Sequence, residues 1–171
     1  MELTGEAFFT VAKNPDAPFI VSMRDLSVTA LGTSFNIKAY ASDSIISAYL
    51  MEGRVLVQSP TETIEMLHAG QCINYDFVQQ KMQKMNVENE RIFTAWHNNE
   101  LVLENERLDN IVKILERQYN INIVISDEQL NSNRYNGTVE NSSLANVLEL
   151  LSLTSNLHYE FQKNEIILSK K

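Results

Sequence analysis

The chain has 171 residues, of which 44% are hydrophobic, and a formal net charge of −8 at pH 7. This length and composition are sufficient for a buried core, in one domain or in two small ones. Residues 1–93 and residues 94–171 each carry 11 acidic and 7 basic side chains, and no basic stripe is present. Nucleic acids and anionic membranes are therefore not expected partners. No run of about 18 apolar residues occurs, so no segment is predicted to span a bilayer.

Cysteine and histidine usage argues against a metal centre. Cys72 is the only cysteine, which excludes an intramolecular disulfide and any multi-cysteine metal site. His68, His97 and His158 lie in three separate segments without the spacing of metal ligands. No glycine-rich phosphate loop or nucleophile elbow occurs either. We expect no metal site and no cofactor, and a conventional enzyme is the least favoured class of protein.

An apolar run starts at Ala7, almost directly after the N-terminus, and no signal segment precedes it. This opening leads us to expect a piece of a longer protein, so the lack of a targeting segment carries no information.

Residues 1–78 are predicted to form an all-β domain. Short apolar runs are separated by turn residues roughly every 8–10 residues, as is typical of a sandwich or a short β-solenoid. The expected strands are 8–11, 19–21, 26–30, 35–39, 45–50, 54–57, 64–67 and 71–75. Gly32 and Thr33 lie between two of these strands, where they form either an ordinary turn or a peptide bond with chemistry of its own. Residues 79–92 are polar and lose the strand alternation, so we interpret them as a connecting segment, helical in part.

Residues 93–171 are predicted to form a second domain that contains an internal duplication. We expect Ile92, Phe93 and Trp96 to anchor its start. A shift of 36 residues aligns Leu103-Glu104-Asn105 with Val139-Glu140-Asn141, Leu108 with Leu144, Asn110 with Asn146, Leu115 with Leu151 and Asn120 with Asn156. Apolar residues at i, i+3, i+4 and i+7 from Leu108 and again from Leu144 predict one amphipathic helix in each copy.

The helix of each copy leads into an alternating strand, 121–125 in the first and 157–161 in the second, and a turn at Lys163-Asn164 precedes a last strand, 166–168. The order is β-α-β, β-α-β-β, an α+β domain in which we expect two helices on one face of a small sheet. Parallel pairing within each unit is predicted. Asn105 and Asn141 are expected to cap the helix starts, and Asn120 and Asn156 to adopt the left-handed conformation after the helix ends.

Two features of the second domain are candidate partner surfaces. The helix over 144–153 also carries Leu150 and Leu153, so it is apolar beyond a single stripe. It is either packed on two sides or partly in contact with a partner. The last strand, with Ile166, Ile167 and Leu168, is predicted to be an exposed edge to which a partner strand adds. Glu104, Glu106 and Asp109 cluster at the start of the first helix, where they suit the helix dipole.

A set of ordered motifs resembles the periplasmic FecR domain of sigma-factor regulators, the anti-sigma factors. The motifs are Gly5-Glu6-Ala7-Phe8-Phe9-x-Val11, Pro18-Phe19-x-Val21, Leu31-Gly32-Thr33-x-Phe35-Asn36-Ile37, Glu52-Gly53-x-Val55 and Ala69-Gly70-Gln71. Trp96, Glu100-Leu101-Val102-Leu103 and the duplicated unit resemble the domain that follows in the Bacteroidetes-type members. That domain is similar to the secretin and TonB-dependent-transporter N-terminal (STN) fold. The resemblance spans residues 5 to 169.

The resemblance implies a single-pass inner-membrane protein whose cytoplasmic segment holds an extracytoplasmic-function sigma factor. Its periplasmic part receives a signal from the N-terminal domain of a TonB-dependent outer-membrane transporter. The sequence contains neither the cytoplasmic segment nor the membrane helix, so sigma-factor binding maps onto none of its residues. The leading hypothesis is a periplasmic module that relays the transporter's state by binding another protein.

Two other hypotheses remain. Some family members cleave themselves at this Gly-Thr step, and the Thr33 hydroxyl is able to attack the open Gly32 carbonyl in an N-to-O acyl shift. The alternative is that Gly32 makes a tight turn and Thr33 begins a strand. A module that binds glycan or cell wall is the third hypothesis, since β-sandwiches commonly do so. It needs an exposed aromatic platform, for which Tyr40, Tyr49 and Tyr75 are the candidates.

Overall fold

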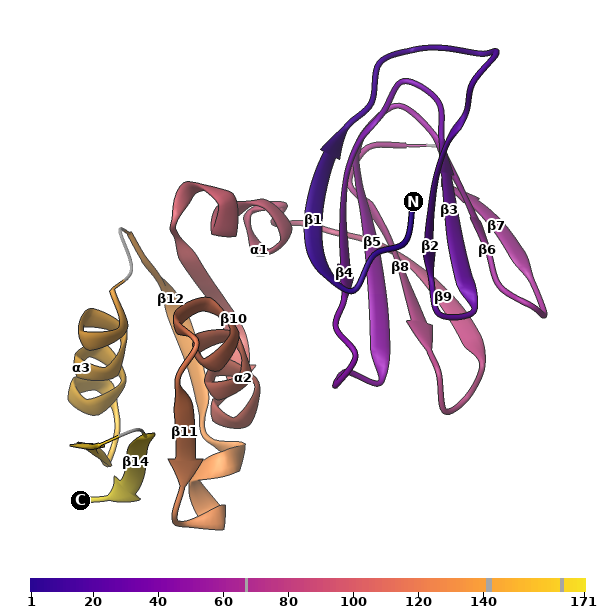
Figure 1. Cartoon of the computed structure of the whole chain (residues 1–171). Coiled ribbons are helices and arrows are strands. Elements are labelled where there is room, and N and C mark those ends of the chain that lie inside the picture. The colour runs from indigo at the N-terminus through magenta and orange to yellow at the C-terminus, as the bar shows by residue number, and fades with distance from the viewer. Residues whose placement is uncertain (67, 141–142, 164) are drawn as a thin grey trace. The chain divides into compact units, whose positions relative to one another are not determined.

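The computed structural model describes residues 1–66, 68–140, 143–163 and 165–171 (Figure 1). The chain forms two compact units, Met1–Thr94 and Ala95–Lys171. Three positions that carry predictions, Leu67 at a strand end, Asn141 as a helix cap and Asn164 in a turn, lie outside the described residues.

The first unit consists of two antiparallel sheets (Figure 1). The five-stranded sheet has the order β1-β4-β5-β8-β9, with β1 Gly5–Thr10, β4 Ser34–Ala39, β5 Ile45–Glu52, β8 Gln71–Asp76 and β9 Lys81–Asn86. The four-stranded sheet has the order β2-β3-β6-β7, with β2 Phe19–Met23, β3 Leu26–Ala30, β6 Val55–Gln58 and β7 Thr63–Met66. The short helix α1, Arg91–Thr94, ends the unit.

The core of the first unit lies between these sheets. Alternate residues of each strand point inward, for example Val28 and Ala30 from one sheet and Phe35 and Ile37 from the other, and all four are fully buried. Since both sheets contribute to one core, the unit is a sandwich rather than a solenoid.

The prediction that residues 79–92 connect two domains is wrong for 81–86. These residues form the edge strand β9, which pairs with β8 from Asp76↔Lys81 to Gln71↔Asn86. Asp76 fixes the intervening turn, because its Oδ1 atom accepts hydrogen bonds from the backbone N–H groups of Val78 (2.8 Å) and Gln79 (3.0 Å). Met82 is the one buried residue of β9. Because the strand has a single inward side chain, its sequence is polar and shows no clear alternation, and the strand was therefore not predicted.

In the described part of the second unit there are two α-helices, two short 3-10 helices (η1 and η2) and two small sheets (Figure 1). Its elements are η1 Ala95–Asn98, β10 Leu101–Arg107, α2 Leu108–Tyr119, β11 Asn122–Ile125, η2 Glu128–Ser132, β12 Arg134–Val139, α3 Leu144–Thr154, β13 Leu157–Gln162 and β14 Glu165–Lys170. The predicted helical stripe of α2 is confirmed, because Leu108, Ile111, Val112 and Leu115 are all buried. The α+β class predicted for the chain is also confirmed.

Strand pairing in the second unit differs from the prediction of one sheet with parallel pairing inside each copy. The first strands of the two copies, β10 and β12, pair antiparallel with each other. The second strands, β11 and β13, flank β14, so the other sheet has the order β11-β14-β13. Helix α2 contacts both β10 and β11, and α3 contacts both β12 and β13. Each helix therefore joins the two sheets. Residues from both sheets and both helices form one core, whereas the prediction placed all of these strands in a single sheet.

The predicted helix caps are only partly right. Asn120 has the left-handed φ of 51° predicted after α2. Asn105 does not cap α2, since its φ is 52° and Arg107 precedes the helix without a side-chain cap. Ser143 caps α3 through a hydrogen bond from Asn146 N to its hydroxyl (3.2 Å), and α3 ends at Ser155 in extended conformation instead of at a left-handed Asn156.

Candidate functional site

The Gly32–Thr33 peptide lies in a tight connection between β3 and β4. Gly32 has a φ of 64°, in the left-handed region where glycine carries no penalty. Thr33 exchanges two backbone hydrogen bonds with Val11: its carbonyl accepts from Val11 N (2.8 Å), and its N–H donates to the Val11 carbonyl (3.1 Å). The peptide is therefore held in position by the end of β1.

The carbonyl side of this peptide is closely packed against the β5–β6 hairpin. A Cβ on Gly53 would lie 2.5 Å from the Gly32 carbonyl oxygen and 2.7 Å from Thr33 Cγ2. Gly53 also has a φ of 86°. Only glycine satisfies both conditions, so Gly53 allows the hairpin to approach the Gly32–Thr33 bond.

Thr33 has the one unusual side chain of this connection. The residue is only 3% exposed, and its Oγ1 atom has no hydrogen-bond partner among the residues that the structure describes. A buried hydroxyl that lacks a partner costs free energy, so such groups need an explanation. In the hypothesis of self-cleavage, the bond that breaks joins the Gly32 carbonyl carbon to the Thr33 nitrogen, and the attacking hydroxyl is that of Thr33. It is thus a nucleophile without a competing hydrogen bond.

The predicted partner-binding strand is not an edge. Residues Ile166, Ile167 and Leu168 lie in β14, which pairs with β11 on one side and β13 on the other. Ile166 and Leu168 are fully buried. The prediction of an exposed edge at 166–168 is therefore wrong, because the last strand inserts between the two copies' second strands.

Helix α3 presents its two candidate residues differently. Leu150 is half-buried and packs on the core, whereas Leu153 is 76% exposed. The helix is therefore mostly a core element with one isolated apolar residue in solvent, and isolated exposed leucines are common on protein surfaces.

Strand β13 is one of the two edges of the three-stranded sheet, and the sequence reasoning did not consider it as a partner strand. Phe161 is 57% exposed, and its ring packs edge-on against Tyr159 with ring centroids 5.9 Å apart. His158 of the same strand is also exposed. The alternation Leu157, Tyr159, Phe161 was visible in the sequence, but which strand forms the edge depends on long-range pairing.

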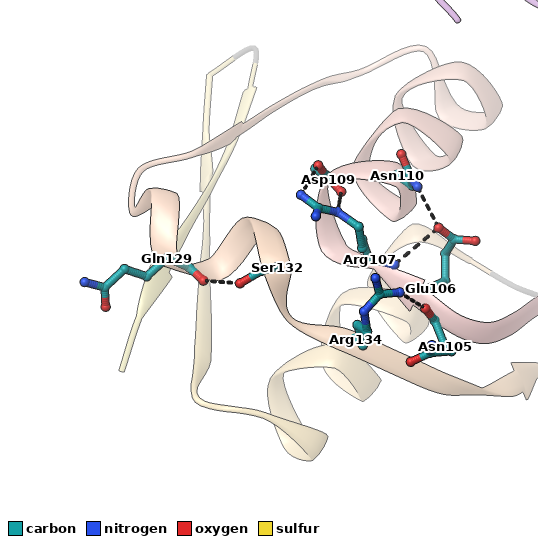
Figure 2. A network of polar contacts seen from close by, with 8 residues as sticks. All are labelled: Asn105, Glu106, Arg107, Asp109, Asn110, Gln129, Ser132 and Arg134. Atoms are coloured by element: carbon teal, nitrogen blue, oxygen red, sulfur yellow. Dashed lines mark hydrogen bonds and ion pairs between the residues drawn. The ribbon is translucent and has the colours of Figure 1, made fainter. Parts of the chain in front are cut away.

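A polar network surrounds the junction of β10 and α2 (Figure 2). Arg107 forms two hydrogen bonds to Asp109 (3.0 and 2.8 Å), which hold the pKa of Asp109 below its ordinary value. Asn110 donates to Glu106 (2.8 Å). These acidic residues stabilise the start of α2, as predicted for Asp109 at a helix N-terminus.

The same network locks a bulge in β10. The register slips between Leu103 and Glu106. The backbone of the bulged Asn105 is held by two side chains of β12, since its N–H donates to Asn136 Oδ1 (2.7 Å) and its carbonyl accepts from Arg134 Nη1 (2.6 Å). The bulge is therefore a built feature that makes this strand pair irregular.

The outer face of the five-stranded sheet is covered by α1. Phe93 stacks on Tyr49 with ring centroids 4.8 Å apart and planes 9° apart, and the Tyr49 hydroxyl donates to Glu90 Oε2 (3.3 Å). Tyr49 is paired in register with Cys72, and both are buried. Burial raises the pKa of Cys72 and that of Tyr49 to about 12. The expectation that Phe93 anchors the second unit is wrong, because its ring packs on the first.

The glycan platform is not present where it was expected. Tyr49 and Tyr75 are each 1% exposed, and Tyr40 is half-buried. Two of the three candidate rings are thus unable to stack on a sugar. No group of three His, Cys, Asp or Glu side chains in the described part of the chain is placed to hold a metal ion.

None of the helices among the described residues is both long and apolar enough to cross a bilayer.

Comparison with known proteins supplies the class of protein. The family model "FecR protein" matches residues 2–56, and the model "FecR, C-terminal" matches residues 100–168. A crystal structure of a candidate anti-sigma factor from Parabacteroides distasonis ATCC 8503, at 1.65 Å resolution, is similar with a TM-score of 0.88 and 30% sequence identity. The similarity covers 99% of this chain and 79% of that one.

A second crystal structure from the same organism, at 2.50 Å, gives a TM-score of 0.86 with the same identity and coverage. No curated protein matches the chain. The two-unit, mainly β architecture is thus that of a sigma-factor regulator. The chain belongs to the FecR family of anti-sigma factors.

Proposed function

We propose that this chain is the periplasmic, signal-receiving region of a transmembrane anti-sigma factor. In this proposal it binds the N-terminal signalling domain of a TonB-dependent outer-membrane transporter and relays the transporter's state to an extracytoplasmic-function sigma factor. A cytoplasmic segment outside this sequence holds the sigma factor. The all-β unit is the FecR-like domain, and the second unit is an STN-like domain.

One observation carries the proposal. The FecR model lies within the first unit and the FecR C-terminal model lies within the second, so both parts of a sigma regulator occur in order in one chain. A binding role fits this arrangement better than turnover of a small molecule.

The test is a calorimetric titration of the full chain with the purified signalling domain of the transporter encoded beside it. We expect saturable binding with 1:1 stoichiometry and a negative heat-capacity change, because apolar surface is buried. The isolated transporter barrel without its signalling domain is the control and is expected to give no heat. Absence of binding, with both proteins folded, contradicts the relay.

A second candidate function is self-cleavage between Gly32 and Thr33. The unpartnered Thr33 hydroxyl favours it. In the proposed reaction Thr33 Oγ1 attacks the Gly32 carbonyl carbon, the C–N bond breaks and the Thr33 amine takes up the hydroxyl proton, which leaves an ester. Water then hydrolyses the ester, giving a Gly32 carboxylate and restoring the Thr33 hydroxyl. Two chains held together by the sandwich core are the product.

Substitution of Thr33 separates this chemistry from a structural role. Thr33→Val keeps the side-chain shape and removes the unpartnered hydroxyl, so we expect the free energy of unfolding to rise by about 1 kcal/mol. Intact-mass spectrometry of a longer periplasmic protein is expected to show fragments beginning at Thr33 in the wild type, a mixture in Thr33→Ser, and only intact chain in Thr33→Val. Uncleaved wild-type protein after prolonged incubation rules the reaction out.

A further inference from the structure

We propose that strand β13, Leu157–Gln162, is the docking edge for the partner. A β-strand of the transporter's signalling domain pairs with it and extends the β11-β14-β13 sheet. This inference rests on the proposed function and adds to it the surface and the chemistry of the partner strand.

The backbone of β13 is available for pairing at Tyr159 and Phe161. In the described part of the chain β14 is its only neighbouring strand. Lys171 N donates to the Asn156 carbonyl (3.2 Å), and the next opposed pair is Leu157↔Lys170. Opposed residues of an antiparallel ladder alternate between bonded and non-bonded pairs, so the N–H and C=O groups of Leu157, Tyr159 and Phe161 point away from β14. Leu157 itself is fully buried, so the outward groups of Tyr159 and Phe161 are the ones that a further strand is able to pair with.

The other sheet edges of the second unit are less suited to accept a strand. The β10–β12 pair is irregular, because the bulge at Asn105 is fixed by Asn136 and Arg134. Bulges of this kind protect edges from pairing. Strand β11 has four residues and is in contact with η2. Strand β13 has six residues in continuous register with β14, without a bulge, proline or glycine.

The side chains of β13 define the chemistry of its partner. One face carries Tyr159 and the 57% exposed Phe161, which continue the apolar face of Leu157 beyond the core. The other face carries the exposed His158 and Glu160. Cross-strand neighbours of complementary type stabilise a sheet. The incoming strand is therefore expected to alternate, with an aliphatic or aromatic residue beside Phe161 and a basic residue beside Glu160.

Paired substitutions at Phe161 test the edge. Phe161→Ala removes the ring and is expected to weaken binding of the transporter's signalling domain about tenfold. Phe161→Pro removes the ring and also the outward N–H, and proline is tolerated on an edge where that group faces away from the neighbouring strand. We expect a further loss of about fivefold from Phe161→Pro relative to Phe161→Ala. Glu160→Lys, which does not affect the ladder, is expected to weaken binding about fivefold.

Leu153→Ser is the matched control, since it removes an exposed apolar side chain from α3 and is expected to leave the affinity unchanged. If the wild type binds and both Phe161→Pro and Glu160→Lys bind equally well, the docking edge is overturned while the relay stands. Failure of the wild type to bind overturns both. Self-association is measured by sedimentation. If the wild type self-associates and Phe161→Pro does not, the edge pairs with a second copy of the chain, and the proposal is overturned.

Discussion

Gly53→Ala is expected to lower the free energy of unfolding of the first unit by about 3 kcal/mol. The added Cβ lies 2.5 Å from the Gly32 carbonyl oxygen, so the hairpin must move away from the Gly32–Thr33 bond. The φ of 86° adds the cost of a left-handed conformation for a residue with a side chain. Urea unfolding of the full chain, followed by far-UV circular dichroism, measures the change.

Gly70→Ala is the matched control. Gly70 has nearly the same φ, 82°, but its nearest neighbour would be the Val87 carbonyl oxygen at 3.8 Å. Only the conformational cost remains, and we expect a loss of about 1 kcal/mol. Equal losses from both substitutions would mean that the close approach to Gly32 contributes nothing. If the Gly32–Thr33 bond is cleaved, Gly53→Ala is also expected to slow cleavage, because the carbonyl is no longer held in place.

Phe93→Ala is expected to make Cys72 react at least about tenfold faster with a thiol reagent at pH 7. Phe93 stacks on Tyr49, which lies beside Cys72 on the outer face of the sheet. Loss of this ring removes about 2 kcal/mol of local stabilisation and raises the population of open conformations. Because Cys72 is the only cysteine, the rate of labelling reports on this face alone.

Ile92→Ala controls for a general effect on α1, since Ile92 is 41% exposed, and labelling is expected to be unchanged. A Phe93→Ala rate equal to that of the wild type contradicts the covering role.

The free energy of unfolding of the first unit is expected to depend on pH through Cys72, and the sign of this dependence follows from the pKa of the thiol. Burial raises the folded pKa of Cys72 to about 12, whereas the unfolded thiol titrates near 8.5. The buried, protonated Cys72 thiol therefore contributes fully to the free energy of unfolding below about pH 8.5, and this contribution is lost as the pH rises toward 12.

Local features of the chain were predictable from sequence. The apolar spacing from Leu108 to Leu115 identifies α2, because the helical period depends on neighbouring residues only. The alternation of Leu26, Val28 and Ala30 likewise identifies β3. The Gly32–Thr33 step was correctly placed between two strands.

Non-local features were not predictable. Which strand forms an edge depends on pairing across the fold, so β14 was mistaken for an edge and β13 was overlooked. Tyr49 was a candidate ring for an exposed aromatic platform, but Phe93 of α1 stacks on it and the residue is buried. Strand β9 was missed since one inward side chain, Met82, leaves no periodic pattern. The unpartnered Thr33 hydroxyl arises from three-dimensional packing that alternation does not encode.

Amide hydrogen exchange tests the central claim most directly, namely that this chain receives a transporter domain at a sheet edge. On addition of the transporter's signalling domain, we predict slower exchange of the Tyr159 and Phe161 amides, with no change at Leu153 in α3. Binding that leaves residues 157–162 unprotected, or protection confined to α3, would contradict this account.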